Sequence, residues 1–475
     1  MIVELPIANG FYRSESLPVS AQQGINCYPV IAQAPSLVQE YVVGCPGIEQ
    51  KALITGGGKF GRGVHVMGGV FYCVNGTTLY RVNSDYSYTS LGTITGSSNV
   101  SMADNGTQLL ILVPGSTGYI FTEAPDTLTT ITDPDFTANG NPQYVVFVDG
   151  YFLLSTDQKK FIVSALNDGL SYNALDFGSA ESDPDAVTCP AIYQNQVFIF
   201  GTTTIEVEQN VGGSGFPFQR SGLFFDKGTT APLSVIPAID RLIFVGNGVN
   251  ESPAVWAING NAVEKLSTNS IDTLLQDLTT QEVAAIRSWT YAQKGSYFVG
   301  FSLPTTTIVY DSMSKRWHER QSLINGEIDQ YRVHSMATAY GKVLCNDVID
   351  GRIGSLDPAV FSEYDELIVK KIVTMPFADK MLSLFVPMIE LTVESGVGNS
   401  DATDPVVELE RSVDGGRTWS YSRARTMGEI GQYQKRAIWR RNGRAARYEC
   451  FRFTHAEKSK FVAIQLRADL IEGRK

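Results

Sequence analysis

The amino-acid sequence predicts an all-β protein whose central part is a β-propeller of six or seven blades. A pattern of two short apolar strands around a polar or glycine-rich turn returns seven times, with copies spaced 37, 44, 45, 45, 55 and 46 residues apart. A repeat of about 40–50 residues with strand chemistry is typical of propeller blades, each of which buries its apolar faces against its neighbours. The turn residues that open the seven copies are Gly69, Gly106, Gly150, Asn195, Asp240, Gly295 and Gly341.

The first copy shows the hairpin most completely. Val70–Val74 forms one strand and Thr78–Val82 returns, while Asn75 and Gly76 between them suit the two positive-φ positions of a type I′ turn. Four further hairpins are predicted at Tyr151–Leu154 with Phe161–Val163, Val197–Phe200 with Ile205–Val207, Leu242–Val245 with Ala254–Ile258, and Tyr297–Phe301 with Thr307–Tyr310. The copies at Leu109–Val113 and Val343–Cys345 match least well.

Three regions are expected along the chain. Residues 1–50 are rich in Pro, Gln and Asn and predict an extended N-terminal arm; residues 51–370 hold the propeller; residues 371–475 change to longer alternating strands, Leu382–Val393 and Val406–Arg411, and predict a separate C-terminal β domain. One helix is expected within the long 55-residue interval, with Ser270 as its N-cap. Its apolar face is Leu274, Leu275, Leu278, Val283 and Ile286.

Charge is unevenly distributed. Residues 435–452 carry seven basic residues and one acid, a sum of +6, so the remainder of the −11 chain sums to −17. An acidic body is a poor nucleic-acid binder, because phosphate affinity comes from Lys and Arg. DNA that meets this protein is therefore expected to be passed along rather than gripped. The seven basic residues are Lys435, Arg436, Arg440, Arg441, Arg444, Arg447 and Arg452.

Within that segment we expect a candidate assembly interface made by Arg440, Arg441, Arg444 and Arg447. Trp439 sits where a strand would bury it, and Asn442-Gly443 suits a tight turn. The flanking arginines would then project as a basic ridge able to pair with carboxylates in two-pronged fashion. A solvated basic hairpin is the alternative.

Several other classes of site are disfavoured. The six cysteines are scattered without close pairs, which suggests buried thiols rather than a zinc site or a disulfide framework. No stretch approaches the ~20 apolar residues of a membrane span, and the start lacks a signal peptide, so we expect assembly in a cytoplasm and no membrane partner. The cysteines are Cys27, Cys45, Cys73, Cys189, Cys345 and Cys450.

Catalytic motifs are weak, and no catalytic residue, metal or cofactor is expected. The glycine-rich run from Gly56 to Gly63 lacks the Lys-Ser/Thr end of a phosphate-binding loop and suits the entry to the first blade. The four histidines, His65, His318, His334 and His455, lie far apart and are expected to be structural or on the surface. The acids Asp183, Asp185, Glu206 and Glu208 are expected to be solvated rather than a catalytic carboxylate pair.

Ser412–Trp419 matches the Asp-box of sialidase-like propellers, in which Asp and Gly lock a hairpin turn and Trp packs beneath it. The motif is structural even in that family. This chain has one good copy, outside the repeat region, so a hairpin turn of the C-terminal domain is the expected role.

The order of several short motifs resembles the tail hub, or nozzle, proteins of short-tailed bacteriophages, also called packaged-DNA stabilisation or head-completion proteins. The resemblance covers most of the chain. Two departures are Asn26-Cys27-Tyr28-Pro29, where the family has a Leu-Pro-Val-Asn type segment, and the Asn before Gly443. The motifs are Leu5-Pro6-Ile7, Asn26-Cys27-Tyr28-Pro29-Val30, Cys45-Pro46-Gly47-Ile48, Gly61-Arg62-Gly63-Val64, Val100-Ser101-Met102-Ala103, Phe200-Gly201-Thr202-Thr203-Thr204-Ile205-Glu206, the Ser270 helix with Leu303-Pro304 and Val309-Tyr310-Asp311, and Trp439-Arg440-Arg441-Asn442-Gly443-Arg444.

The resemblance implies a structural virion protein rather than an enzyme. Members form a homohexameric ring below the portal and its adaptor, extend the DNA channel, help to retain packaged DNA and conduct it during ejection. They carry tailspikes or fibres, and often a needle or plug at the tip. The acidic body would then line a lumen that repels the DNA backbone, and the basic segment would meet acidic neighbours in the ring or adaptor.

Two other functions remain open. A glycan-binding or sialidase-like propeller would show a concave pocket with clustered arginines and activity on a sialoside. A cellular propeller scaffold would be a stable monomer. The hub function instead predicts ring oligomers without turnover.

Overall fold

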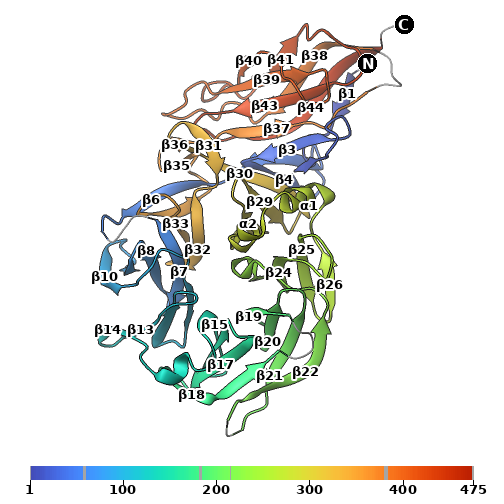
Figure 1. Cartoon of the computed structure of the whole chain (residues 1–475). Helices are drawn as coiled ribbons and strands as arrows, with labels where there is room; N and C mark the ends of the chain where they lie inside the picture. The colour runs from blue at the N-terminus through green and yellow to red at the C-terminus, as the bar shows by residue number, and fades with distance from the viewer. Residues whose placement is uncertain (1, 57–59, 181–184, 214, 379–382, 473–475) are drawn as a thin grey trace.

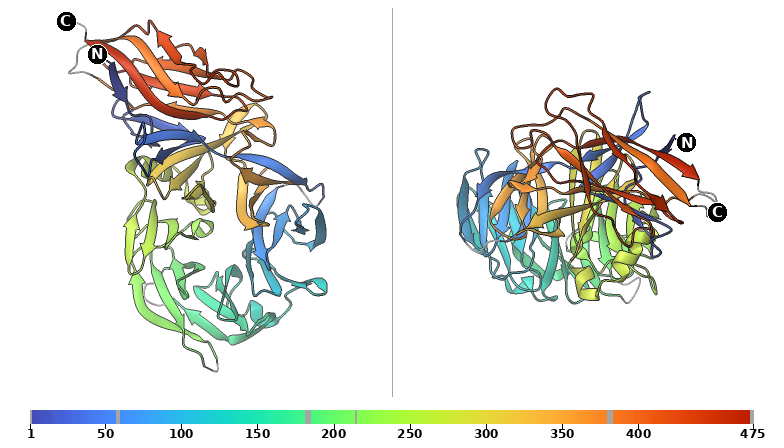
Figure 2. Two further views of the ribbon diagram at one scale, coloured as in Figure 1. Left: turned by 180° about the vertical axis from the view of Figure 1, so that it is seen from behind. Right: turned by 90° about the horizontal axis from the view of Figure 1, so that it is seen from above.

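The computed structural model describes residues 2–56, 60–180, 185–213, 215–378 and 383–472. Gly57, Gly58, Lys59, Asp183 and Leu382, which enter the predictions above, lie outside the described residues. Figure 1 shows a ring of small sheets with a two-layered β domain on one side of it, and Figure 2 shows both chain ends at that domain.

The described residues form seven four-stranded antiparallel units arranged in a ring, which settles the predicted six or seven blades as seven. The first strands of successive units contact each other, and the first strand of the seventh unit contacts the first strand of the first unit, which closes the ring. The units are β7 (Gly61–Met67), β8 (Val70–Asn75), β9 (Thr78–Val82), β10 (Tyr88–Thr93); β11 (Ser101–Asp104), β12 (Gln108–Leu112), β13 (Gly118–Glu123), β14 (Asp126–Thr130); β15 (Pro142–Val148), β16 (Tyr151–Thr156), β17 (Lys160–Ala165), β18 (Asp168–Ser179); β19 (Val187–Tyr193), β20 (Gln196–Gly201), β21 (Ile205–Asn210), β22 (Phe218–Phe225); β23 (Ile236–Ala238), β24 (Arg241–Gly246), β25 (Ala254–Asn259), β26 (Ala262–Lys265); β27 (Arg287–Gln293), β28 (Ser296–Ser302), β29 (Thr307–Asp311), β30 (Arg316–Ile324); and β32 (Val333–Ala339), β33 (Lys342–Asp347), β34 (Arg352–Asp357), β6 (Gly47–Leu53).

The predicted hairpins are the second and third strands of the blades, and the turn residues that open them follow the first strand. Six of the seven opening residues have positive φ; at the fifth, Ile239 (φ 61°) takes this conformation instead of Asp240. The prediction of a type I′ turn at Asn75-Gly76 is wrong. Asn75 is the last strand residue, paired with Thr78, and in the loop Gly76-Thr77 only Gly76 has positive φ.

The seventh blade takes its fourth strand from the beginning of the chain. β6 pairs antiparallel with β34 in a register that sets Ile48 opposite Leu356 and Ala52 opposite Ile353. The ring is thereby closed by joining residues about 300 positions apart in sequence, and loop closure of this length costs entropy that the buried pairs must offset. β35 (Ser362–Glu363) extends the same sheet in parallel with β6, and β36 (Glu366–Leu367) follows it.

The expected helix is two short helices between the fifth and sixth blades, α1 (Asn269–Gln276) and α2 (Thr280–Ala284). Thr268, not Ser270, is the N-cap of α1. Ser270 is buried. Its hydroxyl accepts from the Arg13 amide and donates to the Arg13 carbonyl, and these two hydrogen bonds anchor the N-terminal arm. Thr279 caps α2 in a reciprocal capping box with Glu282.

The expected N-terminal arm contributes strands to both parts of the molecule. β1 (Ile2–Leu5) pairs with the last strand of the chain, β2 (Tyr12–Arg13) pairs with β3 (Ala21–Ile25), and β4 (Cys27–Ile31) pairs with β5 (Glu40–Gly44). β3 also joins the sixth blade, whose β31 (Glu327–Gln330) extends it on the other side. The arm therefore lies between the propeller and the C-terminal domain.

The C-terminal domain is a β-sandwich. Its buried face is shared by Trp439, Phe451, Phe453, Leu391 and Leu466. One sheet has the order β4-β5-β44-β38-β41, with β42 beside β38; the other continues from the sixth blade through β3-β37-β43-β39-β40. The strands are β37 (Lys370–Val373), β38 (Leu384–Val393), β39 (Val406–Ser412), β40 (Arg423–Thr426), β41 (Ala437–Arg440), β42 (Arg444–Ala445), β43 (Cys450–His455) and β44 (Val462–Glu472); two 3-10 turns lie at Pro134–Phe136 and Pro232–Ser234.

A buried arginine holds the connection from the first blade to the second. Arg62 is fully buried, and its guanidinium donates to the carbonyls of Ser98 (2.6 Å), Gly76 (2.8 Å), Thr95 (2.9 Å) and Ile94 (3.2 Å). Buried carbonyls need partners. The segment Gly61-Arg62-Gly63 therefore has a structural role in this chain.

We expect Arg62→Ala to lower the free energy of unfolding by about 3 kcal/mol or more, because four carbonyls lose a charged donor at once. Thermal or urea unfolding measures the effect. The control is Arg241→Ala, which removes a half-exposed pair with Glu264 (2.9 Å) and should cost at most about 1 kcal/mol. Equal effects of the two substitutions would contradict this role for Arg62.

Candidate assembly interface

Trp439 anchors the basic segment, as the sequence predicts. It lies on β41, where Ile389 of β38 is its partner, and it is fully buried. Its indole N–H donates to the Arg423 carbonyl (2.6 Å), and its ring packs 5.8 Å from that of Phe453. The strand is thus held by the buried side chains of Ala437 and Trp439, and the neighbouring Arg440 faces solvent.

A tight turn follows, as the sequence predicts at Asn442-Gly443. The residues with a left-handed backbone conformation are Arg441 (φ 57°) and Gly443 (φ 84°). Asn442 between them is buried and fixes the turn with its side chain. Its amide oxygen accepts from the Arg423 guanidinium (2.5 Å), and its amide nitrogen donates to the Trp439 carbonyl (3.0 Å). The Asn that departs from the resembled family therefore has a local structural reason.

The four predicted interface arginines are exposed. Arg444 lies over the ring of Phe385 at 5.7 Å and Arg447 over that of Tyr448 at 5.8 Å. Within the described part of the chain, no ion pair involves any of the four, so their charges face solvent. They remain a candidate interface.

Three other charges of the segment are already paired. Two carboxylate oxygens of Glu390 accept from Arg436, both at 2.6 Å, and Glu410 accepts from Arg452 at 2.6 and 2.7 Å. The buried acid of the segment, Glu449, is bound by Arg411 in the same two-pronged way. The basic residues that are neighbours in the sequence therefore have two roles in the structure. Arg436 and Arg452 form ion pairs within the sandwich, whereas Arg440, Arg441, Arg444 and Arg447 form an exposed basic ridge.

Two arginines missed by sequence reasoning extend the ridge. Arg423 and Arg425 lie on β40, which contacts β41, and Arg425 donates to the Ile438 carbonyl (2.7 Å). Tyr421, just before this strand, is 96% exposed. Arginine and tyrosine are enriched at protein interfaces. The Arg-Ala-Arg spacing, which places both side chains on one face of a strand, was the available signal.

The Asp-box forms the expected hairpin turn. The Asp414 carboxylate accepts from the Thr418 hydroxyl (2.6 Å), the Arg417 and Thr418 amides and the Ser412 hydroxyl (2.7 Å). Gly415 and Gly416 have positive φ. Desolvation raises the pKa of Asp414, but these hydrogen bonds outweigh it and hold that pKa well below its ordinary value. The motif shapes a loop.

The histidines stay apart. His65 contacts Asp104 (2.6 Å) between the first two blades, and His334 contacts Asn99 and Ser335. His455 contacts Ser459 and the Val406 carbonyl, and His318 is fully buried. Burial, with Arg320 nearby, lowers the pKa of His318 to about 3. Across the described ranges no three His, Cys, Asp or Glu residues are grouped as metal ligands would be.

The expectation that the acids are solvated is wrong for Glu206 and Glu208, which are 3% and 4% exposed. Both lie on one face of β21, and Arg220 of β22 contacts Glu206 at 3.2 Å. Burial, and then the charge of Glu206, raise the pKa of Glu208 to about 7. Asp185 instead accepts from the Thr203 and Thr204 amides and hydroxyls and fixes a turn.

The cysteines are all buried, as predicted. Among the described residues, no helix is both long enough and apolar enough to cross a bilayer.

Two family models match this chain, and both describe the same bacteriophage protein. Residues 3–361 match the family model described as "Bacteriophage P22 Gp10, beta-propeller", and residues 372–470 match "Bacteriophage P22 Gp10, beta-sandwich". The chain is 24% identical over 439 residues to the tail hub protein gp10 of Salmonella phage P22, covering 88% of this chain and 89% of that protein. The WD40 β-propeller domain of Doa1 superposes with a TM-score of 0.40 at 14% identity, over 66% of this chain and 98% of that one.

The buried carboxylate pair of the fourth blade predicts a pH-dependent effect of Glu208→Gln. The pKa of Glu208 is raised from 4.5 to about 7 in the folded state, so the folded state holds a proton that the unfolded state releases between these values. Ionised Glu208 therefore lowers stability as the pH rises through that window. We expect the substitution to raise Tm by about 1–3 °C at pH 8 and by nothing measurable at pH 4.5.

Thermal unfolding of both forms at the two pH values measures this difference. Glu327→Gln, the same change at an exposed acid of β31, is the control and should shift Tm at neither pH. A gain at pH 4.5 that equals the gain at pH 8 would contradict the raised pKa.

Proposed function

This chain belongs to the bacteriophage P22 Gp10 family, and we propose that it is a structural tail hub subunit of a short-tailed bacteriophage. The observation that carries this proposal is the match of both the propeller and the sandwich, in the same order along the chain, to that one family. The similarity to the tail hub protein gp10 of Salmonella phage P22 supports this role. The seven-bladed ring and the sandwich supply rigid surfaces for assembly rather than a catalytic site.

In finer detail, we propose a homohexameric ring that continues the portal-adaptor channel in the virion tail. The ring helps to retain packaged DNA, anchors tailspikes or fibres, and conducts the genome during ejection; a needle or plug, where one is present, binds at its tip. Its subunits assemble in the host cytoplasm. The −17 outside the basic segment supports a lumen with more Asp and Glu than Lys and Arg, along which the DNA backbone slides with little attraction.

The arginine ridge is the proposed assembly surface. Arg440, Arg441, Arg444 and Arg447 project from a sandwich in which Arg436, Arg452 and Glu449 of the same segment are already paired. A guanidinium without an acidic partner on its own chain is suited to two-pronged binding of a neighbour's carboxylate. The acidic remainder of this same chain, or an acidic face of the adaptor, supplies that carboxylate.

The experiment reverses two of these charges. Arg440→Glu with Arg444→Glu changes strand residues of β41 and β42 that face solvent. We expect the monomer to fold with an unchanged Tm but to lose ring formation and connector binding by at least about tenfold, which corresponds to 1.4 kcal/mol. Negative-stain imaging and sedimentation, with and without purified connectors, measure assembly.

The control is Lys159→Glu with Lys315→Glu, a matched charge reversal at two exposed propeller residues. It should assemble as the unchanged chain does. Assembly of the arginine variant at unchanged salt sensitivity would show that the ridge has no such role. If the chain without substitutions stays monomeric and never binds connectors, the hub function itself is overturned.

A further inference from the structure

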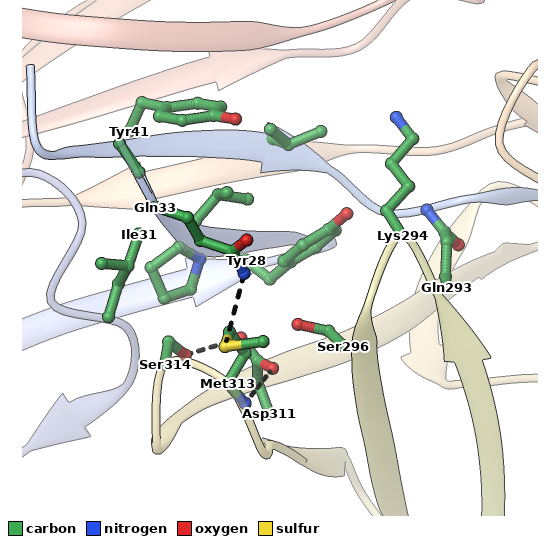
Figure 3. Close-up of a pocket in the computed structure, with 14 residues that line it drawn as sticks. Tyr28, Ile31, Gln33, Tyr41, Gln293, Lys294, Ser296, Asp311, Met313 and Ser314 are labelled. Atoms are coloured by element: carbon green, nitrogen blue, oxygen red, sulfur yellow. Dashed lines mark hydrogen bonds between the residues drawn. The ribbon is translucent and has the colours of Figure 1, made fainter. Parts of the chain in front are cut away.

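A cleft lies where the N-terminal arm meets the sixth blade. Figure 3 shows it between the β4–β5 hairpin and two turns of the blade, and its volume is about 300 Å3. One wall comes from Tyr28–Gln33 with Tyr41 and Val43, and the other from Gln293, Lys294, Ser296, Asp311, Met313 and Ser314. The cleft lies away from the arginine ridge and shares no residue with it.

The cleft extends from one face of the hairpin to the free edge of β4. Six consecutive residues, Tyr28 to Gln33, line it, together with Tyr41 and Val43 of the paired strand β5. Successive side chains of a strand point to opposite faces, so a lining that includes both sets of β4 residues reaches around its edge. β4 is the terminal strand of its sheet and pairs with β5 alone.

The hydrogen-bond parity of the hairpin identifies the open backbone groups. The Ala32 amide donates to the Gln39 carbonyl (2.8 Å), so Ala32, Val30 and Tyr28 face β5. Pro29 and Ile31 face away from β5. Pro29 has no N–H to leave unpaired, which is the usual protection of an edge strand. Ile31 lines the cleft, and neither its N–H nor its C=O pairs with β5.

The opposite wall is rich in donors. Lys294 is exposed and forms no ion pair within the described residues; Gln293 lies beside it, and Ser296 lies nearer Met313 and Asp311 (Figure 3). Burial, and then the nearby Cys45, raise the pKa of Tyr28, so its phenol keeps its proton as a further donor. The one acid, Asp311, is occupied by the Met313 amide (3.0 Å) and the Ser314 hydroxyl (2.6 Å).

We propose that the open edge of β4 binds a short, extended, acidic peptide segment of a partner protein. The segment pairs its backbone with the N–H and C=O of Ile31, as in strand addition to a sheet edge, and its carboxylate binds Lys294. The lack of an N–H at Pro29 limits the pairing to a few residues, in keeping with the cleft's size. Gln33, whose amide contacts the Met313 sulfur at 3.9 Å, moves aside. This site does not depend on the proposed hub role.

The probe is a fluorescein-labelled peptide of sequence Thr-Val-Glu-Val-Thr-Val, titrated with the full chain by fluorescence anisotropy. We expect saturable binding that weakens at least about tenfold when Glu is replaced by Lys in the peptide, and likewise when the peptide's backbone nitrogens are methylated. Lys294→Glu in the protein should weaken binding as much. Lys315→Glu, at an exposed lysine of the next turn that does not line the cleft, should not.

Each outcome decides the proposal. The absence of saturable binding would overturn the proposal. Binding that is unchanged by backbone methylation of the peptide would also overturn it, because edge pairing would then be absent. Binding that is lost equally in Lys294→Glu and Lys315→Glu shows only general charge attraction and also overturns it. Circular dichroism of both variants establishes that they are folded before binding is compared.

Discussion

Closure of the propeller by the N-terminal strand is the constraint on which the rest of the structure depends. Each blade buries its faces only against its neighbours, so an open ring would leave two apolar faces in water. β6 completes the seventh blade, and residues beside it are buried with their charges paired: Glu363 accepts from the Ser322 hydroxyl (2.5 Å) and contacts Arg320 (3.4 Å). Because β6 must reach this position, the residues that precede it run along the side of the ring.

That path makes the arm the joint between propeller and sandwich. Asn26 is buried with a positive φ of 54°, and its side chain binds the Gln321 backbone through N–H and C=O and also the Val369 carbonyl (3.0 Å). Glu40 accepts from Arg316 of the sixth blade at 2.6 and 2.8 Å. The same arm leaves β4 as an edge strand, so the joint and the proposed peptide cleft have one origin.

Sequence patterning was sufficient where the structure is local. Alternating apolar strands and glycine turns predicted the seven hairpins, and an isolated Trp in a basic run predicted the buried anchor Trp439. Sequence patterns were insufficient where segments far apart in the chain determine a residue's burial and its partners. Ser270 resembles a helix cap but is bound by Arg13, 257 residues away. Glu206 and Glu208 resemble solvated acids but are buried, and Arg220 of the adjacent strand contacts Glu206. The division of the basic segment into paired and free arginines required partners, such as Glu390 and Glu410, that no local pattern reveals.

The central claim is that the arm joins the propeller and the sandwich into one cooperative unit. Differential scanning calorimetry of the chain, with Asn26→Ala as the comparison, tests it most directly. The account predicts a single transition for the unchanged chain, and two separated transitions or a broadened one for the variant, which loses the bonds to Gln321 and Val369. Two independent transitions in the unchanged chain, unaffected by Asn26→Ala, would contradict it.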